Sequence, residues 1–257
     1  MDEALVNDPR LNRVDVIGVP ITATNMDDFM ALLRENLDGL RGGYVCVSNV
    51  HTCVMAHDDP VYWACQAGSV ASIPDGKPLS VVGRKQMPTM DRVTGPDLMR
   101  EIFAISDERG WKHYFYGDRS ETLEALRVKL ECEYPNLDIC GMEPSVFRLL
   151  TNEEKVELCA RIDAAGADFC WVALGAPRQE ILMSDLSSRT NCLMVGVGGA
   201  FNVLAGRIPE APRWMQDAGL EWFYRLIQEP SRLFKRYALT NTKFIWYQIT
   251  KAKRKEI

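Results

Sequence analysis

One aspartate stands where a carboxylate could act as a base. Residues 68–73 (GSVASI) form a short apolar run that predicts a buried strand, and Pro74 and Gly76 end it. Asp75 therefore follows the carboxyl end of a strand, which is the edge of an open α/β sheet where ligands bind. A carboxylate there could take the proton of an attacking hydroxyl group. The alternative is an Asx turn in which Asp75 bonds only to its own backbone, because Asp-Gly is a common turn pair.

Three further predicted strand ends carry glycines beside polar groups. They are residues 116–120 (YGDRS), 174–180 (LGAPRQE) and 195–202 (VGVGGAFN). Glycine lets backbone N–H groups approach a phosphate at a helix N-terminus, where the helix dipole also favours an anion. Together these segments predict a nucleotide site.

A dinucleotide fold fits these segments poorly. Residues 196–201 read GVGGAF, so Phe201 stands where the last glycine of the G-x-G-x-x-G fingerprint belongs. The sequence contains neither a G-x-x-x-x-G-K-[ST] motif nor an Asp-x-Asp pair that could hold a divalent cation on a diphosphate. We therefore expect helix dipoles and arginines to neutralise a bound diphosphate, and we expect no metal site.

The elements that must position these groups alternate between strands and helices. Helical segments of about 10 to 15 residues, among them residues 26–40 and 152–164, separate the predicted strands, and this alternation is typical of βαβ units. We therefore expect an α/β fold, a Rossmann-like parallel sheet with helices on both faces, preceded by a small strand pair over residues 14–24. The sheet strands are predicted at residues 44–48, 68–73, 112–116, 137–140, 169–173 and 192–197.

The composition is that of a folded cytoplasmic protein. Of the 257 residues, 47% are hydrophobic, which is ample for a core. No apolar run approaches the roughly 20 residues of a membrane span, and the N-terminus has no basic and apolar segments of a secretory signal. Eight cysteines without a C-x-x-C pair predict buried, reduced thiols, and three histidines are too few to indicate a zinc site.

Charge is distributed unevenly along the chain. Residues 225–257 hold nine Lys and Arg against two Glu, a balance of +7, so the net charge of −5 leaves −12 for residues 1–224. From residue 209 onward the strand pattern stops and a helical one begins. We therefore divide the chain into a Rossmann-like core, residues 1–208, and a basic helical appendage, residues 209–257. The appendage predicts contact with a polyanion: an anionic membrane surface, a phosphate-bearing substrate or nucleic acid.

A series of short motifs runs through the chain in a fixed order. The series resembles the WecG/TagA/CpsF family of bacterial glycosyltransferases over about residues 14 to 240. Membership would imply a Rossmann-like core and transfer of a sugar from a UDP-sugar to a lipid-linked, usually undecaprenyl-diphosphate, acceptor at the cytoplasmic membrane face. It would also imply inversion at the anomeric carbon without a required metal. The motifs are NVH (49–51), PDG (74–76), RVxGxDL (92–98), GAPRQE (175–180), GVGGAF (196–201), APxWM (211–215), GLEW (219–222) and YRLIxEPxR (224–232).

The resemblance also implies roles for individual residues. Asp75 corresponds to the family's proposed general base. Asn49 and Arg92 would lie near the donor or the acceptor, and Gln179 would hydrogen-bond in the pocket. The UDP site would be lined by Gly117, Gly175, Gly199, Phe201 and Glu221.

Three arginines of the appendage would face the acceptor diphosphate. They are Arg225, Arg232 and Arg236, and guanidinium groups are well suited to phosphate. Two positions depart from the family pattern. Val47 stands where the family often has Thr, so a substrate contact from that hydroxyl is lost or moved. Asn202 stands where Asp is usual, which puts a role for this residue in nucleotide recognition in doubt.

Simpler interpretations stand beside these roles. Arg92 could form only a structural ion pair with Asp75 or Asp97, and the basic run of the appendage could be a solvated helix face. Asp97 could serve only as a charge at a helix N-terminus. Several aromatic and imidazole side chains are expected to serve packing or helix capping instead of catalysis: Trp214, Trp222, Phe223, His51 and His113.

From the sequence we expect a hexosyltransferase, peripheral on the inner face of the cell membrane, that takes part in making a surface polysaccharide or cell-wall polymer. Its partners would be a UDP-sugar, a polyprenyl-diphosphate-linked acceptor and the membrane, with no nucleic acid and no cofactor. N-acetylmannosamine, its uronic acid and glucose all fit as the sugar, and a homo-oligomer stays open. The alternatives are a non-catalytic nucleotide- or lipid-binding module and, with less support, an NAD-type oxidoreductase.

Overall fold

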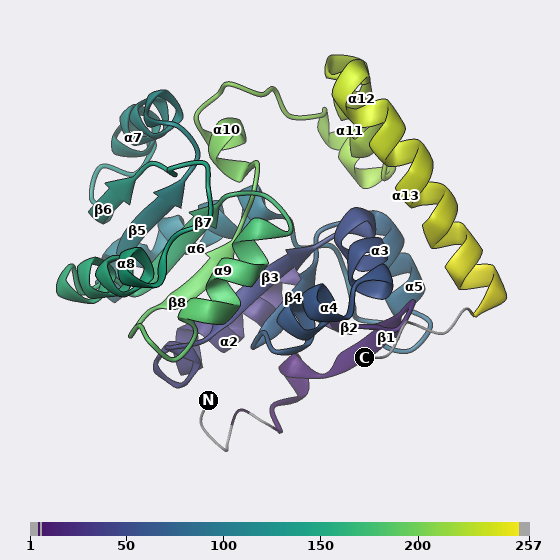
Figure 1. Ribbon diagram of the computed structural model, residues 1–257, viewed down its shortest axis with the longest axis horizontal. Coiled ribbons are helices and arrows are strands. Elements are labelled where there is room, and N and C mark those ends of the chain that lie inside the picture. The colour runs from purple at the N-terminus through teal and green to yellow at the C-terminus, as the bar shows by residue number, and fades with distance from the viewer. Residues whose placement is uncertain (1–4, 6, 252–257) are drawn as a thin grey trace.

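A six-stranded, all-parallel sheet forms the centre of the molecule (Figure 1). The computed structural model describes residue 5 and residues 7–251, apart from the side chains of Asp217 and Arg232. The observed sheet confirms the predicted α/β class. In spatial order its strands are β4 (Ala71–Pro74), β3 (Tyr44–Ser48), β8 (Leu193–Gly196), β7 (Phe169–Ala173), β5 (Lys112–Gly117) and β6 (Asp138–Glu143).

Side chains of the central strands alternate between two core layers. In β7, Phe169 and Trp171 belong to one layer, whereas Cys170 and Val172 belong to the other. A strand buried on both faces reads as a continuous apolar run, which is why the sequence pattern located it. Helices cover both faces of the sheet, as predicted (Figure 1). They include α2 (Met26–Leu40), α6 (Gly95–Arg109) and α7 (Ser120–Glu133) on one face, and α8 (Asn152–Ala164) and α9 (Arg178–Leu186) on the other.

Polar caps fix where several of these helices begin. The Asn25 side chain accepts a hydrogen bond of 2.9 Å from the Asp28 N–H at the start of α2. Thr151 and Glu154 form a reciprocal capping box at the start of α8. Both helices therefore begin at the residue after a capping side chain, and the bounds predicted for them agree with the structure.

A two-stranded antiparallel sheet precedes the main one, as expected. Its strands are β1 (Arg13–Val16) and β2 (Val19–Thr22). Ile17 and Gly18 both have positive φ, 52° and 77°, which suits the tight two-residue turn between them. The pair packs against three short helices in a third hydrophobic cluster: α3 (Val50–Asp58), α4 (Pro60–Ala67) and α5 (Lys77–Gly83).

After β8 the chain is helical. The helices are α10 (Ala200–Leu204), α11 (Arg213–Asp217), α12 (Glu221–Gln228) and α13 (Pro230–Thr250). The sequence pattern did not predict α10, which lies in the glycine-rich segment. Among the described residues, none of the helices combines the length and the apolar character that a membrane crossing requires. The division of the chain into a core and an appendage stays a prediction.

The last helix is attached to the core through α3. Lys243 and Tyr247 of α13 each donate a hydrogen bond of 2.6 Å to the Asp58 carboxylate, and Tyr247 stacks on His57 with ring centroids 3.9 Å apart. Figure 1 shows α13, in yellow, running past α3 at the side of the molecule. These contacts place the inner face of α13 opposite the loops that follow β3 and β4.

Candidate active site

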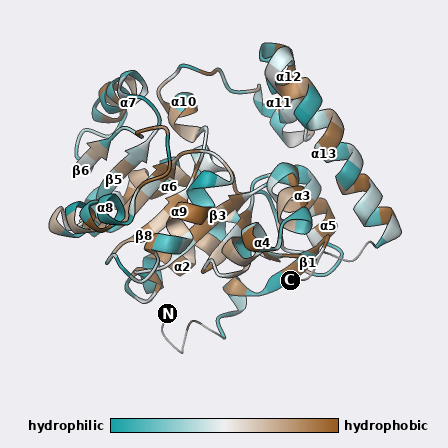
Figure 2. Cartoon of the chain, viewed as in Figure 1, coloured by the Kyte–Doolittle hydropathy of each residue, from teal (hydrophilic) through white to brown (hydrophobic). Residues whose placement is uncertain are grey.

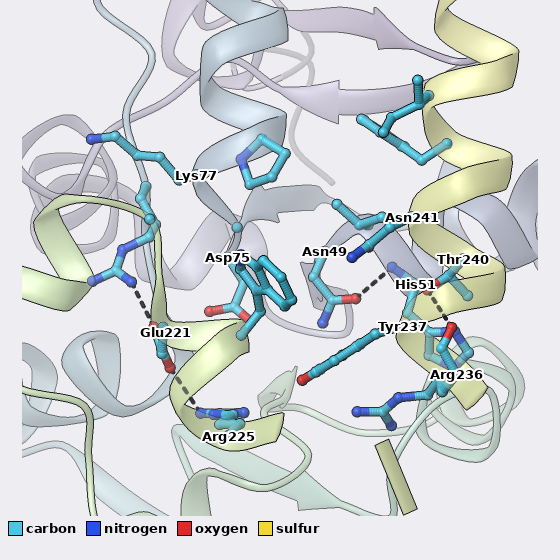
Figure 3. Close-up of a pocket in the computed structure, with 18 residues that line it drawn as sticks. Asn49, His51, Asp75, Lys77, Glu221, Arg225, Arg236, Tyr237, Thr240 and Asn241 are labelled. Atoms are coloured by element: carbon cyan, nitrogen blue, oxygen red, sulfur yellow. Dashed lines mark hydrogen bonds and ion pairs between the residues drawn. The ribbon is translucent and has the colours of Figure 1, made fainter. Parts of the chain in front are cut away.

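A cavity of about 410 Å³ lies at the carboxyl edge of the sheet (Figure 3). Its walls come from the loops after β3 and β4, from the start of α12 and from one face of α13. Carboxyl ends of parallel strands are where ligands bind in such sheets, so the position fits a substrate site. Six of the residues predicted for the site line this cavity: Asn49, Asp75, Arg92, Glu221, Arg225 and Arg236.

Asp75 is held at the end of β4 and faces the cavity. Its backbone N–H donates a hydrogen bond of 2.7 Å to the Ser48 carbonyl oxygen, which continues the β3–β4 ladder by one residue. Burial, and next the negative charge of Glu221, raise the pKa of the Asp75 carboxyl from 3.8 to about 6, against the opposing effects of Arg225, Arg92 and Asn49. At neutral pH the group is mostly ionised, yet it is a stronger base than an ordinary aspartate.

Asn49 links a helix start to this carboxylate. Its side-chain oxygen accepts hydrogen bonds from the N–H groups of His51, at 3.0 Å, and Thr52, at 3.2 Å. The Thr52 hydroxyl accepts in turn from the Asn49 N–H at 2.8 Å, which completes a capping box at the start of α3. The Asn49 amide is thereby fixed in orientation, and its interaction with the Asp75 carboxyl lowers the pKa of that group. One asparagine therefore both caps a helix and acts on the candidate base.

Glu221 bridges two arginines at the cavity wall. One of its carboxylate oxygens accepts a hydrogen bond of 2.7 Å from Arg92. The other forms an ion pair with Arg225 at 3.0 Å. Arg92 also donates to the Gln216 side chain at 3.1 Å. Neither Asp75 nor Asp97 is the ion-pair partner of Arg92 in the structure, so that simpler interpretation of Arg92 was wrong about the partner.

Several lining residues were not singled out from the sequence. Tyr237 and Asn241 lie one helical turn apart on α13 and face the cavity (Figure 3). Their spacing of four residues, continued by Phe244, could have indicated a shared inner face. The Arg236 guanidinium lies 5.2 Å from the centroid of the Tyr237 ring. The side chain of Arg232 lies outside the described part of the structure, so its assignment stays a prediction.

His51 lines the cavity as an uncharged imidazole. Burial, together with the nearby positive charge of Arg236, lowers its pKa below 6.5. Within the described residues its Nδ1 atom is buried and makes no hydrogen bond. His113, the other histidine expected to serve packing, is fully buried between Ser106 and Trp171. The packing prediction therefore holds for His113, whereas His51 faces the cavity.

Residues 14–257 match the Glycosyl transferase WecG/TagA/CpsF family. The chain belongs to this family. The match extends over nearly the whole chain and confirms the resemblance read from the motifs. This WecG/TagA/CpsF protein is accordingly a glycosyltransferase, and neither a non-catalytic binding module nor an NAD-type oxidoreductase is supported.

The glycines assigned to the UDP site of this WecG/TagA/CpsF protein follow β5, β7 and β8, at the same edge of the sheet as the cavity. Gly117 has φ of 127°, and a side chain there would meet the Ala173 backbone at 2.6 Å. Gly175, with φ of 74°, and Gly199 have open space where a side chain would stand. None of the three is among the residues that line the cavity. Their contact with UDP stays a prediction. It would place UDP beside the cavity, at the part of the sheet edge formed by the ends of β5, β7 and β8.

Gln179 and Phe201 are buried side chains. Gln179 is 4% exposed, and its amide oxygen accepts a hydrogen bond of 3.1 Å from the Gly175 N–H while its amide nitrogen donates one of 2.9 Å to Glu180. Phe201 is fully buried and packs on Phe115 with ring centroids 5.7 Å apart. Gln179 therefore holds the loop after β7, and neither side chain is among the residues that line the cavity.

The two departures from the WecG/TagA/CpsF pattern have different surroundings. The Asn202 amide donates a short hydrogen bond to the Asp118 carboxylate. An aspartate at position 202 would place a second carboxylate against Asp118, so the amide here relieves a like-charge contact. Val47 is 8% exposed and belongs to the main hydrophobic cluster.

Three aromatic residues near the cavity are not in the core. The exposed fractions are 65% for Trp214, 41% for Trp222 and 44% for Phe223. The expectation that these rings serve core packing was therefore wrong. An apolar helical stripe predicts a packed face, but it does not say whether protein or another apolar phase covers that face.

Proposed function

We propose that this glycosyltransferase moves a hexosyl group from a UDP-sugar to a polyprenyl-diphosphate-linked glycan, with inversion of the anomeric carbon. The observation that carries the proposal is Asp75, a carboxylate with a pKa of about 6 in a cavity that three arginines also line. A base and cationic groups in one cavity suit an acceptor that carries both a hydroxyl group and a diphosphate.

Asp75 would act as the general base. The acceptor hydroxyl oxygen forms a bond to the anomeric carbon while its proton moves to the Asp75 carboxylate. The bond between that carbon and the UDP oxygen breaks, and its electron pair leaves with UDP. A single displacement of this kind inverts the anomeric centre. A positioned base contributes about 10²–10⁴-fold to the rate of such a step.

The acceptor diphosphate would lie against the arginines of the cavity. Arg92 and Arg225 are both paired with Glu221 in the structure. A diphosphate offers the same guanidinium groups more negative charge and more acceptor oxygens than one carboxylate does. We therefore expect it to displace Glu221 from at least one arginine, with Arg236 contributing from α13.

The donor would occupy the adjoining edge formed by the ends of β5, β7 and β8. Gly175 and Gly199 leave open space there, and α7 and α9 begin just after this edge. The first turn of a helix presents free N–H groups and a partial positive charge to an anion. This arrangement supports placing UDP beside the cavity, with its sugar directed toward Asp75.

Attachment to the inner face of the cell membrane is supported by the outer surface of α13. Figure 2 shows hydrophobic residues at intervals along this helix. Phe234, Leu239, Trp246 and Ile249 are each more than half exposed, and Lys235 lies among them. An apolar helix face edged by basic residues is typical of helices that lie in an anionic membrane interface.

Metal independence stays part of the proposal. Within the described residues, no group of three or more His, Cys, Asp or Glu side chains is arranged to hold a metal ion. The arginines offer cationic charge that could neutralise the leaving diphosphate. Activity in the presence of EDTA tests this directly.

The deciding experiment measures UDP release by the purified protein. The donors are UDP-N-acetylmannosamine, its uronic acid and UDP-glucose, each with a polyprenyl-diphosphate-sugar acceptor, with and without EDTA. Acceptor-dependent release that survives EDTA and is lost in Asp75→Asn supports the donor, the metal-free site and the base together. Consumption of one donor alone identifies the sugar, whereas the UDP-donor proposal fails if none of the three donors is consumed.

A further inference from the structure

The cavity changes character from one end to the other. Along α13, its lining passes from Arg236 through the polar Thr240 and Asn241 to Phe244 and Ile245. Ile245 lies nine positions after Arg236, which is about 14 Å along the helix axis at 1.5 Å per residue. One end of the cavity is therefore cationic and the other apolar.

The opposite wall also offers both kinds of surface. Arg92 and Arg225 act on Asp75 there, whereas Val50 and Pro78 contribute apolar side chains to the cavity lining. Val50 packs on the third hydrophobic cluster, to which Phe244 also belongs. A ligand that fills the whole cavity therefore needs an anionic group joined to a hydrocarbon group.

Ile245 connects the apolar end to the outside of the molecule. It lines the cavity and yet is 57% exposed. Ile249, one turn further along α13, is 76% exposed, and the neighbouring Trp246 is 62% exposed. A hydrocarbon chain that leaves the cavity past Ile245 thus meets the exposed apolar residues Trp246 and Ile249 of α13.

We propose that the apolar end of this cavity binds the isoprene units next to the diphosphate of the acceptor lipid. The inference rests on the proposed function and adds to it a second binding subsite on the same ligand. Hydrocarbon in this subsite would fix the direction of the chain, so that the diphosphate lies at the arginines and the glycan at Asp75. The remaining isoprene units would continue along Ile249 into the membrane.

The wall that forms the subsite is fixed in place. Asp58 on α3 holds Lys243 and Tyr247, which flank Phe244 and Ile245 on the helix. Phe244 is 6% exposed and packs into the third hydrophobic cluster. The subsite is therefore present before a ligand arrives, and binding does not have to order the helix first.

The test compares two soluble probes by calorimetry, farnesyl diphosphate and inorganic diphosphate. We expect the wild-type protein to bind farnesyl diphosphate at least tenfold more tightly, a ratio that corresponds to about 1.4 kcal/mol. Ile245→Asn should reduce this preference to less than about threefold, because it places an amide against the hydrocarbon. Ile227→Asn is the matched control, since it makes the same change at an isoleucine of α12 that is 62% exposed and lies outside the cavity.

The outcomes separate the subsite from the proposed function. Equal binding of the two probes by the wild type, or equal effects of the two substitutions, would overturn the subsite. A farnesyl preference that depends on Ile245, in a protein that transfers sugar to no acceptor, would leave the subsite standing and reject the transferase proposal. Sugar transfer that is equally efficient to farnesyl- and methyl-diphosphate-linked acceptors would reject the subsite and leave the transferase proposal standing. Both isoleucines are more than half exposed, so neither substitution opens a core cavity.

Discussion

Arg92 donates a hydrogen bond of 2.7 Å to Glu221, a residue 129 positions further along the chain. The contact joins the segment that precedes α6 to the first turn of α12. Because Glu221 also pairs with Arg225, one carboxylate holds two guanidinium groups at the cavity. The same carboxylate raises the pKa of Asp75. Glu221 thus affects both the anion-binding groups and the candidate base.

Replacing Glu221 should move the acidic limb of the pH profile. In Glu221→Gln the negative charge is lost while Arg92 and Arg225 keep theirs, so the pKa of Asp75 should fall below about 6. We expect the acidic limb of kcat/KM to shift to lower pH by about half a unit or more. Glu210→Gln is the control, because Glu210 pairs with Arg100 and does not line the cavity. An unchanged limb in Glu221→Gln would contradict the assignment of Asp75 as the titrating group.

Removing the base should reduce turnover and leave nucleotide binding intact. We expect Asp75→Asn to lower kcat by about 10²–10⁴-fold. In the wild type the base must be ionised, so kcat/KM should rise about tenfold per pH unit below pH 6 and level off above it. Asp97→Asn, at a helix start outside the cavity, should behave as the wild type. Full turnover in Asp75→Asn would reject the proposed mechanism.

The same substitution should stabilise the fold. A carboxyl whose pKa is raised from 3.8 to about 6 by folding is destabilising when ionised, by at most about 3 kcal/mol at 1.36 kcal/mol per unit. The penalty is full above about pH 6, shrinks as the pH falls from 6 to 4, and is lost below 3.8, where the unfolded state also binds the proton. Asp75→Asn should therefore gain about 1–3 kcal/mol at pH 7.5 and less at pH 5 in denaturant unfolding. An equal gain at both pH values would point to packing instead of charge.

Two asparagine caps allow the roles of Asn49 to be separated. Asn49→Ala and Asn25→Ala each remove a helix cap, so each should cost about 1 kcal/mol of unfolding free energy. Asn49 also lowers the pKa of Asp75, so its loss should move the acidic limb to higher pH. Asn25, at the start of α2, should leave the pH profile unchanged. Identical profiles for the two variants would show that Asn49 is a cap and nothing more.

Membrane attachment can be tested on the outer face of α13. Phe234 and Trp246 are 65% and 62% exposed, and replacing both with Glu places two charges where hydrocarbon would lie. We expect the double variant to lose sedimentation with vesicles that contain anionic phospholipid, while activity on an acceptor in detergent stays within about twofold. Val128→Glu, which changes a 64% exposed valine on α7, is the control. Sedimentation that persists in the double variant would argue against this face.

The sequence was sufficient for the positions of most strands and helices, but it could not supply the order of the strands. The strands at 44–48 and 169–173 and the helices at 26–40 and 152–164 were predicted with the bounds that the structure has. These elements carry continuous apolar runs or clear caps, which are local signals. The insertion of β8 between β3 and β7 depends on contacts between distant parts of the chain, and no local pattern encodes it.

The candidate site was predictable where a residue stands at a strand end. Asp75 and Asn49 directly follow β4 and β3, so the sheet brings them to one edge. Glu221 could be named from the family resemblance, but its bridge between Arg92 and Arg225 could not, because it requires the packing of α12. The exposure of Trp222 was missed for a similar reason. The sequence of an amphipathic helix does not show whether its apolar residues pack against protein or lie exposed at the surface.

The position of β8 has a consequence for how the chain folds. Tyr44 of β3 pairs with Met194 of β8, so the middle of the sheet joins residues 150 positions apart. While the chain is being synthesised, β3–β4 and β5–β6–β7 can form only as two half-sheets, and the edges of β3 and β7 lie open. The strand that closes both edges is the last to leave the ribosome, which delays completion of the fold until about three quarters of the chain has been made. A chain stopped before residue 193 would carry two unpaired strand edges and would be prone to aggregate, however well its separate helices form.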